Sequence, residues 1–131
     1  MNIVRQPAPA PAAYEVLVVE DEALVAMELQ NLLIEEGFKV LGPAATVQEA
    51  MSILGTASPD VAVLDMKLRG ELVTPVVEAL EQRGVPFLLA SGSPVADLGL
   101  PELANDIINV GKPLQPKYLL HSLAQLLQHR H

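Results

Sequence analysis

The stretch VLVVEDE, residues 16–22, places four consecutive apolar residues directly before three acids. An unbroken apolar run, without alternation between polar and apolar residues, is typical of a strand in a parallel sheet that is covered on both faces. Residues that follow such a strand lie at the carboxyl edge of the sheet, where open α/β folds place their ligand sites. This stretch therefore predicts both the kind of sheet and the edge at which its chemistry takes place.

Four further apolar runs have the same character and predict four further strands. They are Val40–Leu41 together with Phe38, Val61–Leu64, Phe87–Ala90 and Ile107–Val110. Helical patterns lie between these runs. Leucine and valine recur at helical spacing over residues 24–33, before a stop at Gly37.

Local signals place the ends of the other helices. Thr46 and Glu49 form a capping box that opens a helix over residues 47–54. Thr74 is expected to be the N-cap of the next helix, with Pro75 at its first helical position.

That third helix is expected to end at Gly84, and a last, leucine-rich helix begins at Pro116. Residues 91–106 contain two glycines and two prolines, so we expect only a short or irregular fourth helix there. The sequence predicts an α/β fold with a doubly wound, five-stranded parallel sheet, in the flavodoxin-like order 2-1-3-4-5 with helices on both faces.

Composition limits the class of protein. The chain has 131 residues, of which 50% are hydrophobic, so one domain with a well-filled core is expected. We assign residues 14–128 to that domain, residues 1–13 to a flexible leader rich in proline and alanine, and residues 129–131 to a tail. The net charge of −8 argues against nucleic-acid binding, and no apolar stretch has the length of a membrane span. With no cysteine and no signal peptide, we expect a cytoplasmic protein.

Polar side chains follow four of the five predicted strands. Glu20 and Asp21 follow the first strand, Asp65 the third, Ser91 the fourth and Lys112 the fifth. Because the carboxyl ends of parallel strands share one edge of the sheet, we expect these side chains to converge there. The neighbouring Glu22 is interpreted differently, as an acid in the first turn of a helix whose dipole it complements.

The residue types at this edge suit phosphoryl transfer. Clustered carboxylates favour a hard divalent cation such as Mg²⁺. Asp65, at the tip of an apolar strand, could then attack an electrophile as an aspartyl nucleophile. Lys112 and the Ser91 hydroxyl would supply positive charge and a hydrogen bond to the oxygens of the transferred group.

Four motifs, VLVVEDE, VAVLDMKLRG, LLASG and VGKP, stand in an order and at spacings that make the chain resemble response-regulator receiver domains over nearly all of residues 14–128. The resemblance implies that Asp65 accepts a phosphoryl group from a phosphohistidine of a sensor histidine kinase or phosphotransfer protein. It implies that Mg²⁺ is held by Glu20, Asp21, Asp65 and the backbone carbonyl of Lys67. Ser91 would be the switch hydroxyl, and Lys112 the counter-charge, joined to Pro113 by a cis peptide.

Two features depart from the common pattern of that family. Asn109 stands three positions before Lys112, where many receivers carry an aromatic switch residue, and Ser91 replaces a more frequent threonine. The stretch PFLLASG, followed by a segment broken by proline and glycine, looks like the Phe-Ala-Thr-Gly subgroup of receivers, which is associated with HWE-type histidine kinases.

The expected function is that of a single-domain response regulator in two-component signalling. The chain ends soon after the last predicted helix, so output is expected through protein–protein interaction or phosphorelay, by a monomer or weak dimer that is not an enzyme acting on other substrates. A receiver module of a hybrid histidine kinase is an open alternative. A Mg²⁺-dependent aspartyl-phosphate phosphohydrolase is disfavoured because Lys67 stands where its general acid Asp is needed. A flavin or nucleotide binder is disfavoured because the first loop is acidic.

Overall fold

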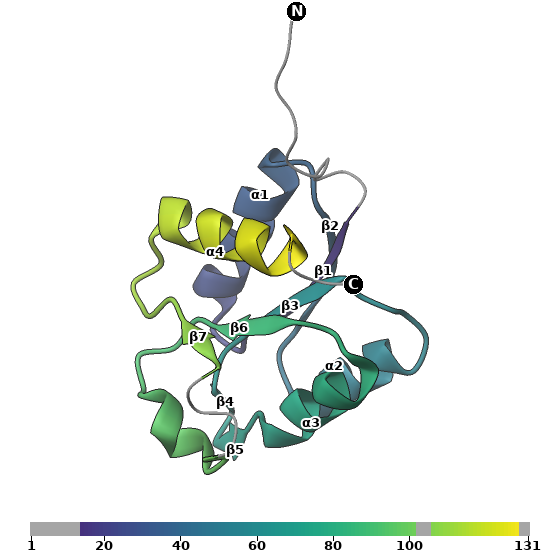
Figure 1. Cartoon of the computed structure of the whole chain (residues 1–131), viewed down its shortest axis with the longest axis vertical. Coiled ribbons are helices and arrows are strands. Elements are labelled where there is room, and N and C mark those ends of the chain that lie inside the picture. The colour runs from purple at the N-terminus through teal and green to yellow at the C-terminus, as the bar shows by residue number, and fades with distance from the viewer. Residues whose placement is uncertain (1–13, 102–105, 129–131) are drawn as a thin grey trace, which may run out of the picture.

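The computed structural model describes residues 14–101 and 106–128, so the predicted leader and tail lie outside the described residues. It confirms the predicted sheet (Figure 1), whose five parallel strands run in the order β2-β1-β3-β6-β7. In chain order these strands are Glu15–Val19 (β1), Lys39–Ala44 (β2), Val61–Leu64 (β3), Phe87–Leu89 (β6) and Ile108–Asn109 (β7).

Two pairs of helices cover the two faces of this sheet. They are Ala23–Glu35 (α1) with Pro116–Gln128 (α4), and Val47–Leu54 (α2) with Thr74–Arg83 (α3). Alternate strand residues divide between the two apolar clusters, since side chains along a strand point to opposite faces. On β1, Val16 and Val18 pack with α1 and α4, whereas Leu17 and Val19 pack with α2 and α3. Both faces are buried, as the unbroken apolar runs predicted.

The capping box at the start of α2 is confirmed. Thr46 Oγ1 accepts a hydrogen bond from the Glu49 N–H at 3.0 Å, and Glu49 Oε1 accepts one from the Ala45 N–H at 2.7 Å. These contacts satisfy backbone donors that the first turn of a helix leaves without intrahelical partners.

The expected N-cap of α3 was wrong by one residue. Thr74 lies inside the helix, and Val73 is the N-cap, without a side-chain cap. Val73 is fully buried and its N–H donates to the Met66 carbonyl at 2.8 Å, so packing and a tertiary hydrogen bond fix the start of this helix. Gly84 ends the helix in the left-handed conformation, as predicted.

A short hairpin between β3 and α3 was not predicted. It pairs Lys67–Leu68 (β4) with Glu71–Leu72 (β5) in an antiparallel ladder. Its two turn residues, Arg69 and Gly70, have φ values of 52° and 85°, the left-handed region that two-residue hairpin turns use. Strands of two residues are too short to show the alternation by which a hairpin is recognised in a sequence.

The segment after β6 contains one short 3₁₀ helix, Val95–Leu98, which agrees with the short or irregular helix predicted there. Residues 102–105 lie outside the described part. Among the described residues, no helix combines the length and the apolar character needed to cross a membrane.

The strand register brings the predicted site residues to one edge. Val19 pairs with Leu64, and Leu64 pairs with Leu89. The next residues along these strands, Glu20 and Asp65, therefore emerge side by side.

A bulge in β2 gives a test of the fold. Gly42 has φ +97°, and a Cβ there would lie 2.7 Å from the Ala44 nitrogen and 2.8 Å from the Val18 oxygen. Both are backbone atoms that cannot move aside without disturbing the β1–β2 ladder. We expect Gly42→Ala to lower the free energy of unfolding by about 2 kcal/mol or more, measured by urea unfolding.

Substitutions at two other glycines distinguish the two expected causes of the loss of stability, the backbone clash and the positive φ. Gly84→Ala meets no atom within 4 Å but keeps a positive φ of 67°, so it should cost about 1 kcal/mol. Gly92→Ala meets neither obstacle and should leave stability almost unchanged. Equal losses in Gly42→Ala and Gly84→Ala would show that the close backbone approach at Gly42 is not a constraint.

Candidate functional site

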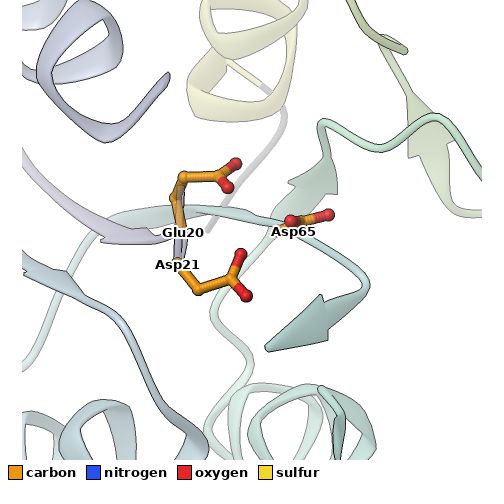
Figure 2. Close-up of side chains that lie close together, drawn as sticks. All are labelled: Glu20, Asp21 and Asp65. Carbon is orange, nitrogen blue, oxygen red and sulfur yellow. The ribbon is translucent and has the colours of Figure 1, made fainter. Parts of the chain in front are cut away.

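Three carboxylates gather at the carboxyl edge of the sheet, as the sequence predicted. One oxygen atom from each of Glu20, Asp21 and Asp65 lies within 4.8 Å of the others (Figure 2). Backbone hydrogen bonds continue the strand ladders into the site and fix it. The Glu20 N–H donates to the Ala44 carbonyl and the Asp65 N–H donates to the Val19 carbonyl, both at 2.8 Å.

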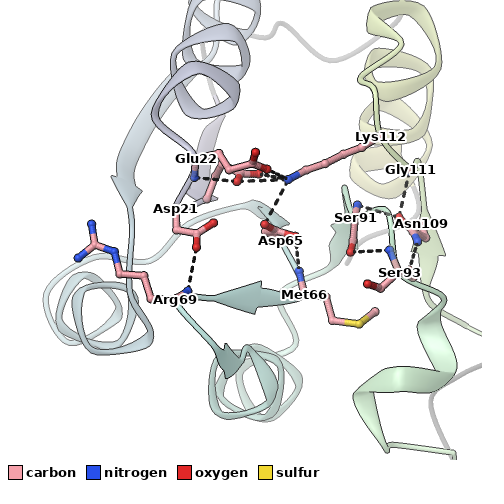
Figure 3. Close-up of polar contacts among 11 residues, drawn as sticks. Asp21, Glu22, Asp65, Met66, Arg69, Ser91, Ser93, Asn109, Gly111 and Lys112 are labelled. Carbon is pink, nitrogen blue, oxygen red and sulfur yellow. Dashed lines mark hydrogen bonds and ion pairs between the residues drawn. The ribbon is translucent and has the colours of Figure 1, made fainter.

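Lys112 supplies the positive charge of this site (Figure 3). Its Nζ lies 3.2 Å from Asp65 Oδ2, 3.2 Å from Glu20 Oε1 and 2.6 Å from Glu22 Oε1. The side chain is only 20% exposed, so the ammonium is partly removed from water and directed at the carboxylates. The peptide bond between Lys112 and Pro113 is cis, as expected.

The two aspartates are also held by backbone donors. Asp65 is 8% exposed, and its Oδ1 accepts a hydrogen bond from the Met66 N–H at 2.8 Å. Asp21 Oδ2 accepts one at 2.8 Å from the N–H of Arg69, in the turn of the β4–β5 hairpin. The hairpin that the sequence did not reveal therefore helps to orient a carboxylate of the site.

Glu20 is the most buried acid of the cluster, with a side chain that is 0% exposed. Burial, together with the nearby charge of Asp65, raises the pKa of Glu20 from 4.5 to about 7, against the opposing effects of the Glu22 N–H and Lys112. Its Oε1 is buried and accepts no well-aligned hydrogen bond among the described residues, although it forms an ion pair with the Lys112 ammonium at 3.2 Å. A buried carboxylate oxygen with unused acceptor capacity, beside two more carboxylates, is suited to a divalent cation with oxygen ligands.

Lys112 remains charged in these surroundings. Burial by itself lowers the pKa of Lys112, but the hydrogen bond to Glu22 and the charges of Asp65 and Glu20 outweigh that effect and raise it. A permanent ammonium beside Asp65 can stabilise negative charge brought to that carboxylate.

Ser91 and Lys67 are the two remaining residues of the predicted site. Ser91 follows β6 and is 5% exposed, and its Oγ accepts a hydrogen bond from the Ser93 N–H at 3.1 Å. Lys67 is exposed at the start of β4. The metal-ligand role of its carbonyl stays a prediction.

Sequence reasoning set aside two residues that belong to this site. Glu22 is the N-cap of α1 and not part of its first turn, and its carboxylate contacts Lys112, so it was wrong to leave this residue out of the site. Its position as the third acid after β1 was the available signal. Asn109 was noted only for its departure from the family pattern, yet its side chain makes three hydrogen bonds around Ser91 (Figure 3).

Comparison with known sequences supports this geometry. A family model described as "Response regulator receiver domain" matches residues 16–123. The transcriptional regulatory protein PdtaR of Mycobacterium tuberculosis (strain H37Rv) is 33% identical over 92 residues, which cover 70% of this chain and 45% of PdtaR. The phyllosphere-induced regulator PhyR of Methylorubrum extorquens is 30% identical over 121 residues, which cover 90% of this chain and 45% of PhyR. The chain spans less than half the length of these two relatives.

Solved structures agree. The solution structure of the PhyR receiver domain of Erythrobacter litoralis superposes with a TM-score of 0.80 at 27% identity, covering 90% of this chain and 92% of that one. The solution structure of SdrG from Sphingomonas melonis gives a TM-score of 0.75 at 36% identity, covering 88% of this chain and 98% of SdrG. From the match over residues 16–123 and the acidic edge built around Asp65, we conclude that the chain belongs to the response regulator receiver domain family.

Proposed function

We propose that Asp65 accepts a phosphoryl group from a phosphohistidine of a sensor histidine kinase or phosphotransfer protein. The observation that carries this proposal is the hydrogen bond of the Lys112 ammonium to Asp65 Oδ2, inside a cluster of carboxylates. A lone carboxylate at a strand end serves many structural purposes, whereas this one has a cation and two further acids directed at it.

In the proposed reaction, one carboxylate oxygen of Asp65 attacks phosphorus, and the phosphorus–nitrogen bond of the donor breaks. The electron pair of that bond returns to the imidazole, and an acyl phosphate forms on Asp65. Lys112 stabilises the negative charge of the incoming group. The Ser91 hydroxyl, whose oxygen accepts a hydrogen bond from the Ser93 N–H, donates a hydrogen bond to a phosphoryl oxygen.

The residues of the edge fit a magnesium ion. Glu20, Asp21, Asp65 and the Lys67 carbonyl would hold it, and the ion would offset the repulsion between the carboxylates and the phosphoryl group. The buried Glu20 oxygen, which pairs with Lys112 but accepts no well-aligned hydrogen bond among the described residues, is the feature of this chain that supports such a site.

Output is proposed to occur through protein–protein interaction or phosphorelay, by a cytoplasmic monomer or weak dimer with no enzymatic activity on other substrates. The finer assignment to receivers paired with HWE-type kinases is supported by the short 3₁₀ helix in the described part of the segment after β6. A receiver module within a longer chain, such as a hybrid histidine kinase, is the second candidate, since the curated relatives are longer than this chain.

Phosphorylation by a small-molecule donor tests the proposal. After incubation with acetyl phosphate and Mg²⁺, intact-mass spectrometry should show one added phosphoryl group. Asp65→Asn should abolish the adduct because the nucleophile is lost, and EDTA should abolish it because the carboxylates then repel the donor.

Asp97→Asn, at an exposed acid of the 3₁₀ helix, is the matched control and should be modified like the wild type. An adduct that persists in Asp65→Asn would contradict the assignment of the acceptor. A wild-type protein that binds Mg²⁺ and stays unmodified would contradict the proposed reaction.

The raised pKa of Glu20 gives a second test, in the metal-free protein. Between pH 4.5 and about 7 the folded protein holds a proton on Glu20 that the unfolded chain has released, so the free energy of unfolding falls as pH rises through this window. Glu20→Gln removes this dependence. We expect the variant to gain about 1–3 kcal/mol over the wild type between pH 5 and pH 8, measured by urea unfolding in EDTA.

Glu28→Gln, at an exposed glutamate of α1, is the control and should follow the wild-type profile at every pH. If Glu20→Gln also runs parallel to the wild type, burial of Glu20 does not penalise its charged form. Added Mg²⁺ should stabilise the wild type at pH 8 and have less effect on Glu20→Gln, because the amide is a weaker cation ligand.

A further inference from the structure

The side chain of Asn109 connects two loops of the site. Its Oδ1 accepts hydrogen bonds from the Ser91 N–H at 3.1 Å and the Gly111 N–H at 3.0 Å, and its Nδ2 donates to the Ser93 carbonyl at 3.0 Å. One amide group therefore satisfies two backbone donors and one backbone acceptor. Figure 3 shows these contacts beside Asp65.

These bonds determine what the Ser91 hydroxyl can do. Ser91 Oγ accepts from the Ser93 N–H, and Asn109 holds the Ser93 carbonyl and the Ser91 N–H on either side of that contact. A hydroxyl has one proton to donate and two lone pairs. The Ser93 N–H takes one lone pair of Ser91 Oγ, and the hydroxyl proton remains available for a hydrogen bond to another oxygen.

The Asn109 amide also contacts the loop that carries Lys112. Asn109, on β7, pairs with Leu89, on the neighbouring β6, and Ser91 follows two residues after Leu89. Its contact with the Gly111 N–H lies immediately before Lys112. Asn109 thus connects the loop of the hydroxyl to the loop of the ammonium, the two groups proposed to contact the phosphoryl oxygens.

We infer that Asn109 is a positioning residue for phosphoryl transfer, which holds the Ser91 hydroxyl as a hydrogen-bond donor toward the group on Asp65 and fixes the spacing of Ser91 and Lys112. The inference deepens the proposed function and rests on it. A phenylalanine at this position could offer neither the two-fold acceptor nor the donor that these loops use.

A double-mutant cycle tests this role. Asn109→Ala removes all three hydrogen bonds and should slow phosphorylation of Asp65 by acetyl phosphate and Mg²⁺ roughly two- to tenfold, the effect of losing one or two neutral hydrogen bonds. Because the effect passes through the Ser91 hydroxyl, Asn109→Ala should slow the reaction much less in a Ser91→Ala background. Asn31→Ala, at an exposed asparagine of α1, is the control and should keep the wild-type rate.

A second readout requires no phosphorylation. In the metal-free protein, Asn109→Ala should accelerate hydrogen exchange at the Ser91 and Gly111 amides, whereas Asn109→Asp, which keeps the acceptor oxygen, should leave both protected. Asn109→Ser replaces Asn109→Ala in the cycle if the alanine variant does not fold, because its shorter side chain cannot make the three hydrogen bonds.

The outcomes distinguish a failure of the role inferred for Asn109 from a failure of the phosphorylation proposed for Asp65. If the wild type takes up a phosphoryl group and the effects of Asn109→Ala and Ser91→Ala on the rate are additive, Asn109 does not act through the hydroxyl and the inference is overturned alone. Unchanged exchange at Ser91 and Gly111 in Asn109→Ala overturns it as well. A wild type that takes up no phosphoryl group overturns the proposed function, and the role of Asn109 with it.

Discussion

Repulsion between carboxylates is the constraint around which this protein is organised. The register of the sheet places Glu20, Asp21 and Asp65 at one edge, and Glu22 lies next to them. A single ammonium, that of Lys112, contacts three of these four acids. One positive charge does not balance four carboxylates. The raised pKa of Glu20 reflects this imbalance, because protonation of Glu20 removes one negative charge. Protonation of Glu20 and binding of a cation both reduce the repulsion between these carboxylates.

The parts of the fold that depend on apolar patterning could be predicted from the sequence. The runs at Val61–Leu64 and Phe87–Ala90 predicted buried parallel strands because hydrophobic burial acts on each run separately. The convergence of Glu20, Asp65 and Lys112 followed from their positions at the carboxyl ends of parallel strands, which share one edge of the sheet.

What could not be predicted depends on contacts between distant residues. Val73, not Thr74, is the N-cap of α3 because its N–H reaches the Met66 carbonyl, and no local signal shows that bond. The carboxylate of Glu22 turns to Lys112, 90 residues away, where a local argument assigned it to the helix dipole. Asn109 shows the same limit, since an amide on a short strand gives no sign in the sequence of the loops it will meet.

The turn at Arg69 has a consequence for how this site tolerates sequence variation. Asp21 is oriented by the N–H of Arg69, a group that every amino acid except proline carries, and the residue stands at φ 52°. The contact that orients Asp21 therefore depends on the backbone conformation at this position and not on the charge of its side chain. Glycine and asparagine are neutral exchanges there, whereas valine, isoleucine and proline are not, because they cannot adopt the conformation that presents this N–H to the aspartate. The amino acid at this position can thus change while the backbone hydrogen bond to Asp21 is kept.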